Sequence, residues 1–103
     1  MITVSALYRN EEGKKFDMAY YFNEHIPMIK QKLGHACKRI SVEHGLGGAT
    51  PGTRANFLIM FHLYFESVEA FQTAFGPHAQ AIMGDIPNYT DIQPMIQVSD
   101  VKM

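Results

Sequence analysis

The chain has 103 residues, 47% of them hydrophobic, a formal net charge of −1 and a single cysteine, Cys37. That length suits one domain with one core, which we expect to span residues 1–103. The composition excludes a disulfide framework, a basic nucleic-acid interface, a secretion signal and a membrane span, and it favours a cytoplasmic protein with no nucleic-acid or membrane partner.

The first 45 residues predict a strand, a helix and a second strand. The predicted bounds are Ile2–Arg9 for the first strand, Met18–Leu33 for the helix and Cys37–Gly45 for the second strand. Alternation and β-branched residues indicate the first strand. Asp17 can cap the helix, Phe16 can pack on Tyr21 as a hydrophobic staple, and Gly34 can end the helix.

A loop rich in Gly and Pro over residues 45–56 leads into a further strand, helix and strand. The predicted bounds are Phe57–Phe65, a helix from the capping residue Ser67 to about Met83 with an interruption at Gly76-Pro77, and Ile92–Lys102. Pro94 indicates an edge position for the last strand.

The order βαββαβ is that of the ferredoxin-like α+β fold, a four-stranded antiparallel sheet with both helices on one face. The strand Phe57–Phe65 is largely apolar on both sides, so both sides are expected to be buried. The helices can cover only one side. The other, with Leu58, Met60, His62 and Tyr64, predicts a two-fold homodimer. The alternative is a monomer with an exposed apolar sheet, and large exposed apolar patches are rare.

His25 lies on the apolar stripe of the first helix, where an aliphatic residue would pack better. The stripe comprises Met18, Tyr21, Phe22, His25, Met28 and Ile29. Pro27 cannot donate to the Asn23 carbonyl, so the helix should kink or restart beside the imidazole and open a gap there.

The second helix repeats this arrangement, because Gly76-Pro77 interrupts its apolar stripe directly before His78. We therefore predict that His25 and His78 face one shared pocket and carry out acid–base chemistry, since burial keeps imidazole neutral and basic. Tyr21, one turn before His25, could donate a hydrogen bond to a substrate carbonyl. The alternative for either histidine is a core residue satisfied by a backbone carbonyl.

Three residues just after the second helix, Asp85, Asn88 and Tyr89, could line the pocket mouth or orient a histidine. An ordinary turn explains this segment equally well, because Asp, Pro and Asn are turn residues. His44, at the end of a strand, could join the rim, although an exposed strand end is the alternative reading. No metal or cofactor site is expected: HExxH and a Cys cluster are absent, and "GLGGAT" lacks the third glycine of a dinucleotide motif.

Three stretches together resemble the EthD family: "FDMAYYFNEHIPMI", "GLGGATPG" and "FQTAFGPHAQAIMGDIPNYTDIQPMIQVSDV". The resemblance covers essentially the whole chain, and "MGDIPNYTDIQP" is its most specific part. It implies a dimeric α/β barrel with a cleft between helices and sheet, and it favours His25 and His78 as the functional pair. The family is named for ethyl tert-butyl ether degradation alongside a cytochrome P450 system, which implies a functional link to such a system.

Three functions remain open from the sequence. The first is a cofactor-free enzyme that acts on a small apolar or aromatic carbonyl compound, with His25 rather than His78 as the proton-transfer group. The second is a non-catalytic protein that holds such a compound for a partner oxidase. The third, implied by the resemblance, is a haem-binding barrel with one of these histidines as axial ligand.

Overall fold

The computed structural model describes residues 1–103 and has the strand and helix order that the sequence predicts. The strands are Ile2–Arg9 (β1), Arg39–His44 (β2), Phe57–Phe65 (β3) and Met95–Asp100 (β4). They form one antiparallel sheet in the order β2-β3-β1-β4. The predicted ferredoxin-like α+β fold is confirmed, with β2 and β4 shorter than the sequence suggested.

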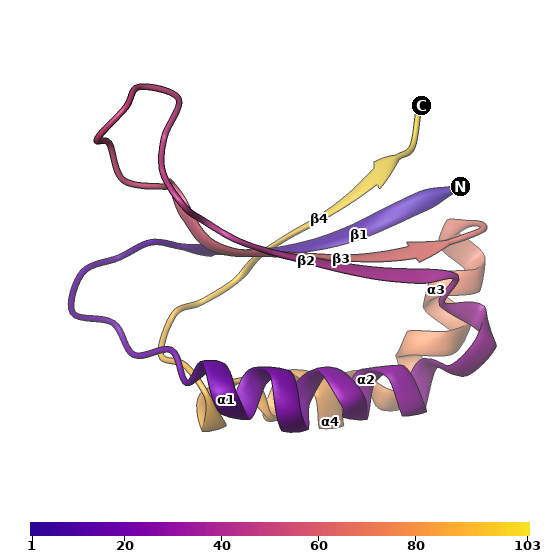
Figure 1. The fold of residues 1–103 in the computed structure, drawn as a ribbon. Helices are drawn as coiled ribbons and strands as arrows, with labels where there is room; N and C mark the ends of the chain where they lie inside the picture. The colour runs from indigo at the N-terminus through magenta and orange to yellow at the C-terminus, as the bar shows by residue number, and fades with distance from the viewer.

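The helical regions lie against one face of this sheet. They are Met18–Tyr20 (α1), the π-helical segment Tyr21–His25 (η1), Ile26–Leu33 (α2), the 3₁₀ turn Gly34–Ala36 (η2), Val68–Phe75 (α3), the 3₁₀ turn Gly76–His78 (η3), Ala79–Gly84 (α4) and the 3₁₀ turn Ile86–Asn88 (η4). Figure 1 shows α1, α2 and α4 on one side of the sheet, whereas the loop 45–56 rises on the other side. None of these helices is long and apolar enough to cross a membrane.

The helix ends are stabilised by the local signals in the sequence. The Asp17 side chain accepts a hydrogen bond from the Tyr20 backbone N–H, and the Ser67 hydroxyl accepts one from the Ala70 N–H. The rings of Phe16 and Tyr21 pack edge to face with centroids 5.0 Å apart, which confirms the staple.

The core lies between the sheet and the helices. In β3, the helix-facing residues Ile59, Phe61, Leu63 and Phe65 are buried, whereas Leu58, Met60, His62 and Tyr64 are half-buried on the other side. Strand β1 alternates in the same way, because Val4 and Tyr8 pair in register with Leu63 and Ile59. The predicted division of β3 into two faces is therefore confirmed.

The predicted stripe of the first helix needs one correction. The helical spacing predicts that Phe22 is buried, but Phe22 is 44% exposed, and Ile26 is buried instead. The cause is the π-helical segment, in which the Ile26 N–H donates to the Tyr21 carbonyl five residues earlier. This wider turn accommodates one extra residue, so the buried face continues from His25 to its neighbour Ile26.

We call the sheet surface opposite the helices the open face. The molecule measures 41 × 33 × 19 Å, and 19 Å accommodates about two layers at roughly 10 Å each, so this chain supplies no third layer. A polar cluster crosses the open face: the Ser5 Oγ lies 2.7 Å from the His62 Nδ1, and the Glu43 Oε1 lies 3.1 Å from the His62 Nε2. Ser5 is buried in this arrangement.

Candidate functional site

A cavity of about 210 Å³ lies between the sheet and the helices. Its wall is formed by Val4, Ala6, Tyr8, His25, Ile29, Phe61, Leu63, Phe71, Phe75, Ile82, Met83, Ile86, Pro94 and Ile96. Met83 and Ile96 are 41% and 52% exposed, so they mark the side on which the cavity meets solvent. Only Tyr8 and His25 bring polar side-chain atoms to this wall.

His25 is held in one orientation by Asp85. The side chain of His25 is 4% exposed, and its Nδ1 lies 2.9 Å from the Asp85 Oδ2. Burial lowers the pKa of His25, and the hydrogen bond to Asp85 opposes this only in part. The ring is therefore neutral at neutral pH, with one nitrogen protonated and the other a hydrogen-bond acceptor.

Asp85 is itself fixed by two further donors. The Tyr20 hydroxyl donates to the Asp85 Oδ1 at 2.6 Å, and the Asn88 amide donates to the same oxygen at 2.9 Å. Burial alone would raise the pKa of Asp85, but the hydrogen bonds from Tyr20, Asn88 and His25 outweigh it and hold that pKa below its usual value. Asp85 is therefore a carboxylate that accepts hydrogen bonds on both oxygens.

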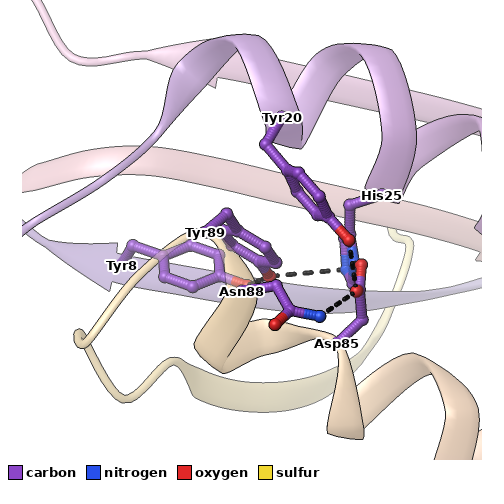
Figure 2. A network of polar contacts seen from close by, with 6 residues as sticks. All are labelled: Tyr8, Tyr20, His25, Asp85, Asn88 and Tyr89. Carbon is purple, nitrogen blue, oxygen red and sulfur yellow. Dashed lines mark hydrogen bonds and ion pairs between the residues drawn. The ribbon is translucent and has the colours of Figure 1, made fainter.

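The π-helical segment explains how Tyr20 and His25 reach the same carboxylate. At 100° per residue, residues five apart on an α-helix point about 140° away from each other. In a π-helix the backbone hydrogen bonds join residues five apart, so side chains at that spacing lie nearly above one another. Figure 2 shows the Tyr20 hydroxyl and the His25 ring meeting at Asp85.

The second nitrogen of His25 faces two tyrosines. The Tyr89 hydroxyl lies 3.4 Å from the His25 Nε2, which is a long hydrogen bond, and the Tyr8 hydroxyl lies 2.6 Å from the Tyr89 hydroxyl. Both tyrosines are buried, and burial raises the pKa of each, so both are protonated at neutral pH. A hydrogen-bonded chain thus runs from Tyr8 in the cavity wall through Tyr89 and His25 to Asp85 (Figure 2).

Four of the seven predicted site residues belong to this hydrogen-bonded chain or contact it: His25, Asp85, Asn88 and Tyr89. Asp85 orients His25 directly from this turn, as one of the two readings of the segment predicts. The Nδ1 partner is a carboxylate and not the backbone carbonyl that the core-histidine alternative supposes.

The other three predicted residues lie outside the cavity wall. His78 is half-buried in η3 but does not line the cavity, so the structure does not bring it together with His25. His44 is exposed at the end of β2. The Tyr21 ring stacks on the His25 ring with centroids 5.7 Å apart, but its hydroxyl is buried, has no hydrogen-bond partner and does not reach the cavity.

Two residues of the site were not singled out from the sequence. Tyr8 could have been found, because the alternation of β1 places Ile2, Val4, Ala6 and Tyr8 on the helix-facing side, where a tyrosine hydroxyl needs a partner. Tyr20 carried no such signal. It lies off the apolar stripe of a regular helix and reaches Asp85 only because of the π-helical segment.

The residues present do not fit a haem ligand. An axial histidine needs a ring nitrogen directed into open space, but the His25 Nδ1 is held by Asp85 and the Nε2 faces Tyr89. His78 does not reach the cavity. No group of three or more His, Cys, Asp or Glu side chains is placed to hold a metal ion.

Comparisons with known proteins agree with this fold. A family model described as the EthD domain matches residues 10–93. The crystal structure of an EthD-like protein from Ralstonia eutropha is 43% identical, covers 99% of this chain and 92% of its own, and superposes with a TM-score of 0.93. An ethyl tert-butyl ether degradation (EthD) family protein from Bacillus halodurans is 20% identical, with coverage of 98% of both chains and a TM-score of 0.67.

A third solved structure, HapK from Hahella chejuensis, shares the fold alone. It is 12% identical, with a TM-score of 0.55 over 100% of this chain and 95% of its own. No match was found among curated proteins.

Proposed function

Because this chain belongs to the EthD family, we propose that it binds a small apolar or aromatic compound between its helices and its sheet and uses His25 to move a proton on that compound. One observation carries this proposal: the neutral His25, oriented by Asp85, lies in the wall of a cavity whose lining is apolar except for His25 and Tyr8. The degradation role in the family's name is the context in which such a compound would be consumed.

The arrangement suits general base catalysis. A carboxylate on Nδ1 fixes the tautomer and stabilises the imidazolium that forms when Nε2 takes a proton, as Asp does in a serine protease triad. Tyr89 would give that proton to Nε2, Tyr8 would give its own to Tyr89, and the ligand would give one to Tyr8. A positioned base of this kind contributes roughly 10²- to 10⁴-fold to a rate. The apolar wall strengthens the electrostatic interaction inside by excluding water.

A second candidate is a non-catalytic carrier that holds the compound for a partner oxidase, such as a cytochrome P450 system. The observation that favours it is the contact of the His25 Nε2 with Tyr89, because a histidine engaged at both nitrogens can serve binding alone. A homodimer through the open face belongs to either candidate.

Ligand binding tests the cavity. Ala6 is half-buried in its wall, and Ala6→Phe would fill the space. Val98 lies on the same side of the sheet but outside the wall, so Val98→Phe is the matched control. In calorimetry with para-ethylphenol, we expect the wild type and Val98→Phe to bind and Ala6→Phe not to bind. Equal binding by all three would place the ligand elsewhere.

Proton exchange separates the enzyme from the carrier. The probe is phenylacetone in D₂O, with loss of its α-proton followed by NMR. We expect the wild type to accelerate exchange and His25→Asn to lower the rate by about 10²-fold or more. His35→Asn, at an exposed position, should match the wild type. Binding of para-ethylphenol without any acceleration of exchange would favour the carrier.

A further inference from the structure

The hydrogen-bonded chain behind the cavity has a direction. Asp85 is a carboxylate and can only accept, so the His25 Nδ1 must carry the ring proton. The His25 Nε2 of the neutral ring is then an acceptor, and the Tyr89 hydroxyl donates to it. The Tyr89 oxygen in turn accepts from the Tyr8 hydroxyl at 2.6 Å. Every proton in the chain points towards Asp85.

This direction determines what a ligand meets. The Tyr8 hydroxyl donates its proton to Tyr89, so towards the cavity Tyr8 can only accept a hydrogen bond through its oxygen lone pairs. His25, the other polar residue of the wall, has both nitrogens engaged. We infer that the cavity selects small apolar compounds that carry an O–H group, such as alkylphenols, because its polar contact is an acceptor. This inference rests on the proposed function, since it places the ligand in the same cavity.

Size and charge narrow the ligand class further. An apolar cavity of about 150 Å³ binds benzene, and this one is about 210 Å³, which leaves room for one ring and a short alkyl group. The wall contains no Lys or Arg, so it offers an anionic ligand no partner charge. The compound that fits is neutral, has one ring and donates one hydrogen bond.

Three probes of similar size test the direction of the chain. Para-ethylphenol can donate, whereas para-ethylanisole and para-methylacetophenone can only accept. In calorimetry with the wild type, we expect the phenol to bind about 10-fold more tightly than either of the others, which corresponds to one net hydrogen bond. Equal affinities, or a preference for the ketone, would overturn the inference.

Asp85→Asn provides a test in which the preference should change sign. Tyr20 and Asn88 both donate to the Oδ1 position, so the amide oxygen of the variant must stay there and its NH₂ must face His25. The His25 Nδ1 then accepts, the Nε2 donates to Tyr89, and the Tyr8 hydroxyl is released to donate into the cavity. We expect this variant to bind the ketone more tightly than the phenol. Retention of the phenol preference would contradict the inferred direction of the hydrogen bonds from Tyr8 to Asp85.

Further variants keep the test decisive if Asp85→Asn does not fold. Tyr89→Phe cuts the chain, leaves Tyr8 free to donate or accept, and should abolish the preference. Tyr64→Phe, on the open face, should keep it. Binding of all three probes without preference would overturn the inference and leave the proposed apolar cavity intact, whereas binding of none would overturn both.

Discussion

At His25, burial and a neighbouring carboxylate act on the same proton in opposite directions. Burial lowers the pKa of the ring, and the Asp85 carboxylate would raise it, but burial has the larger effect. A base that is neutral and nearly enclosed is useful in catalysis, because it can take a proton without first losing one to water. The lowered pKa of His25 also makes the free energy of unfolding depend on pH in a defined direction.

The pH dependence of unfolding follows from that lowered pKa. Below the ordinary value of 6.5, the unfolded chain protonates this histidine while the folded chain does not. The unfolded state then binds more protons, so the free energy of unfolding should fall as pH falls, by at most about 1.4 kcal/mol per pH unit from this group. Urea unfolding between about pH 7.5 and pH 5 measures the slope. His25→Asn should flatten it, and an unchanged slope would show that His25 is not a buried neutral ring.

Tyr21 shows the opposite case, a buried polar atom without a partner. Its side chain is 1% exposed, and its hydroxyl forms no hydrogen bond. An unsatisfied buried group costs about 1–3 kcal/mol, so Tyr21→Phe should leave stability unchanged or raise it by about 1 kcal/mol. Tyr89→Phe is the control, because it removes a hydroxyl with two partners and should destabilise. Thermal unfolding compares the two, and loss of stability in Tyr21→Phe would mean that its hydroxyl has a partner.

The π-helical segment is the element on which the site depends. It brings Tyr20 and His25 to one carboxylate and lets both His25 and Ile26 face the sheet. Pro27 favours it, because the ring of a proline clashes with the carbonyl four residues earlier in a regular helix, here that of Asn23. A wider turn just before the proline relieves that clash.

Deletion of the exposed Glu24 should convert this segment to a regular α-helix. His25 and Ile26, which are both buried in the wild type, would then be neighbours on a regular helix and point about 100° apart, so they could no longer both face the sheet. We expect a folded protein with affinity for para-ethylphenol at least about 10-fold lower than that of the wild type. Glu24→Ala keeps the residue count and should bind normally. Unchanged affinity in the deletion variant would mean that the π-helical segment is not needed.

Sequence patterns predicted the elements well because their causes are local. The apolar alternation of β3, the caps Asp17 and Ser67 and the terminating Gly34 each act within a few residues. The site was only partly predictable because its contacts are distant in sequence. Asp85 was one of several candidates in a turn, and only the fold shows that it meets His25, from which it is separated by 60 positions.

The same difference between local and distant causes explains why His78 does not line the cavity beside His25. A proline break beside a histidine on an apolar stripe looks alike in both helices, yet only the first contains a π-helical segment that turns the ring towards the cavity. The turn before α4 is of the 3₁₀ type, which is narrower, and it leaves His78 half-buried away from the wall.

At the scale of the whole molecule, we expect the open face to be covered by a second copy of the chain. Its half-buried residues Leu58, Met60 and Tyr64 lie on either side of the polar cluster at His62, and no third layer of this chain covers them. Sedimentation at micromolar concentration should give twice the 11.7 kDa chain mass. Met60→Glu should give the 11.7 kDa monomer or an aggregate, since it would bury an unpaired charge.

A glutamate introduced on the helical side of the molecule is the control for the added charge of Met60→Glu. Gln80 is exposed on α4, and Gln80→Glu should sediment like the wild type. A wild type that shows only the 11.7 kDa species would leave the open face uncovered and refute the dimer.

The strand order β2-β3-β1-β4 has a consequence for how the protein is made. The first strand synthesised lies between β3 and β4, so it waits for both neighbours while the chain leaves the ribosome. The hydrogen bond between Tyr8 and Tyr89 spans 81 positions, and such long-range closure is slow because its entropy must be lost before the contact forms. An incomplete chain therefore exposes apolar strand edges and cannot hold the ligand. The affinity for a phenol would thus serve as a reporter of complete folding.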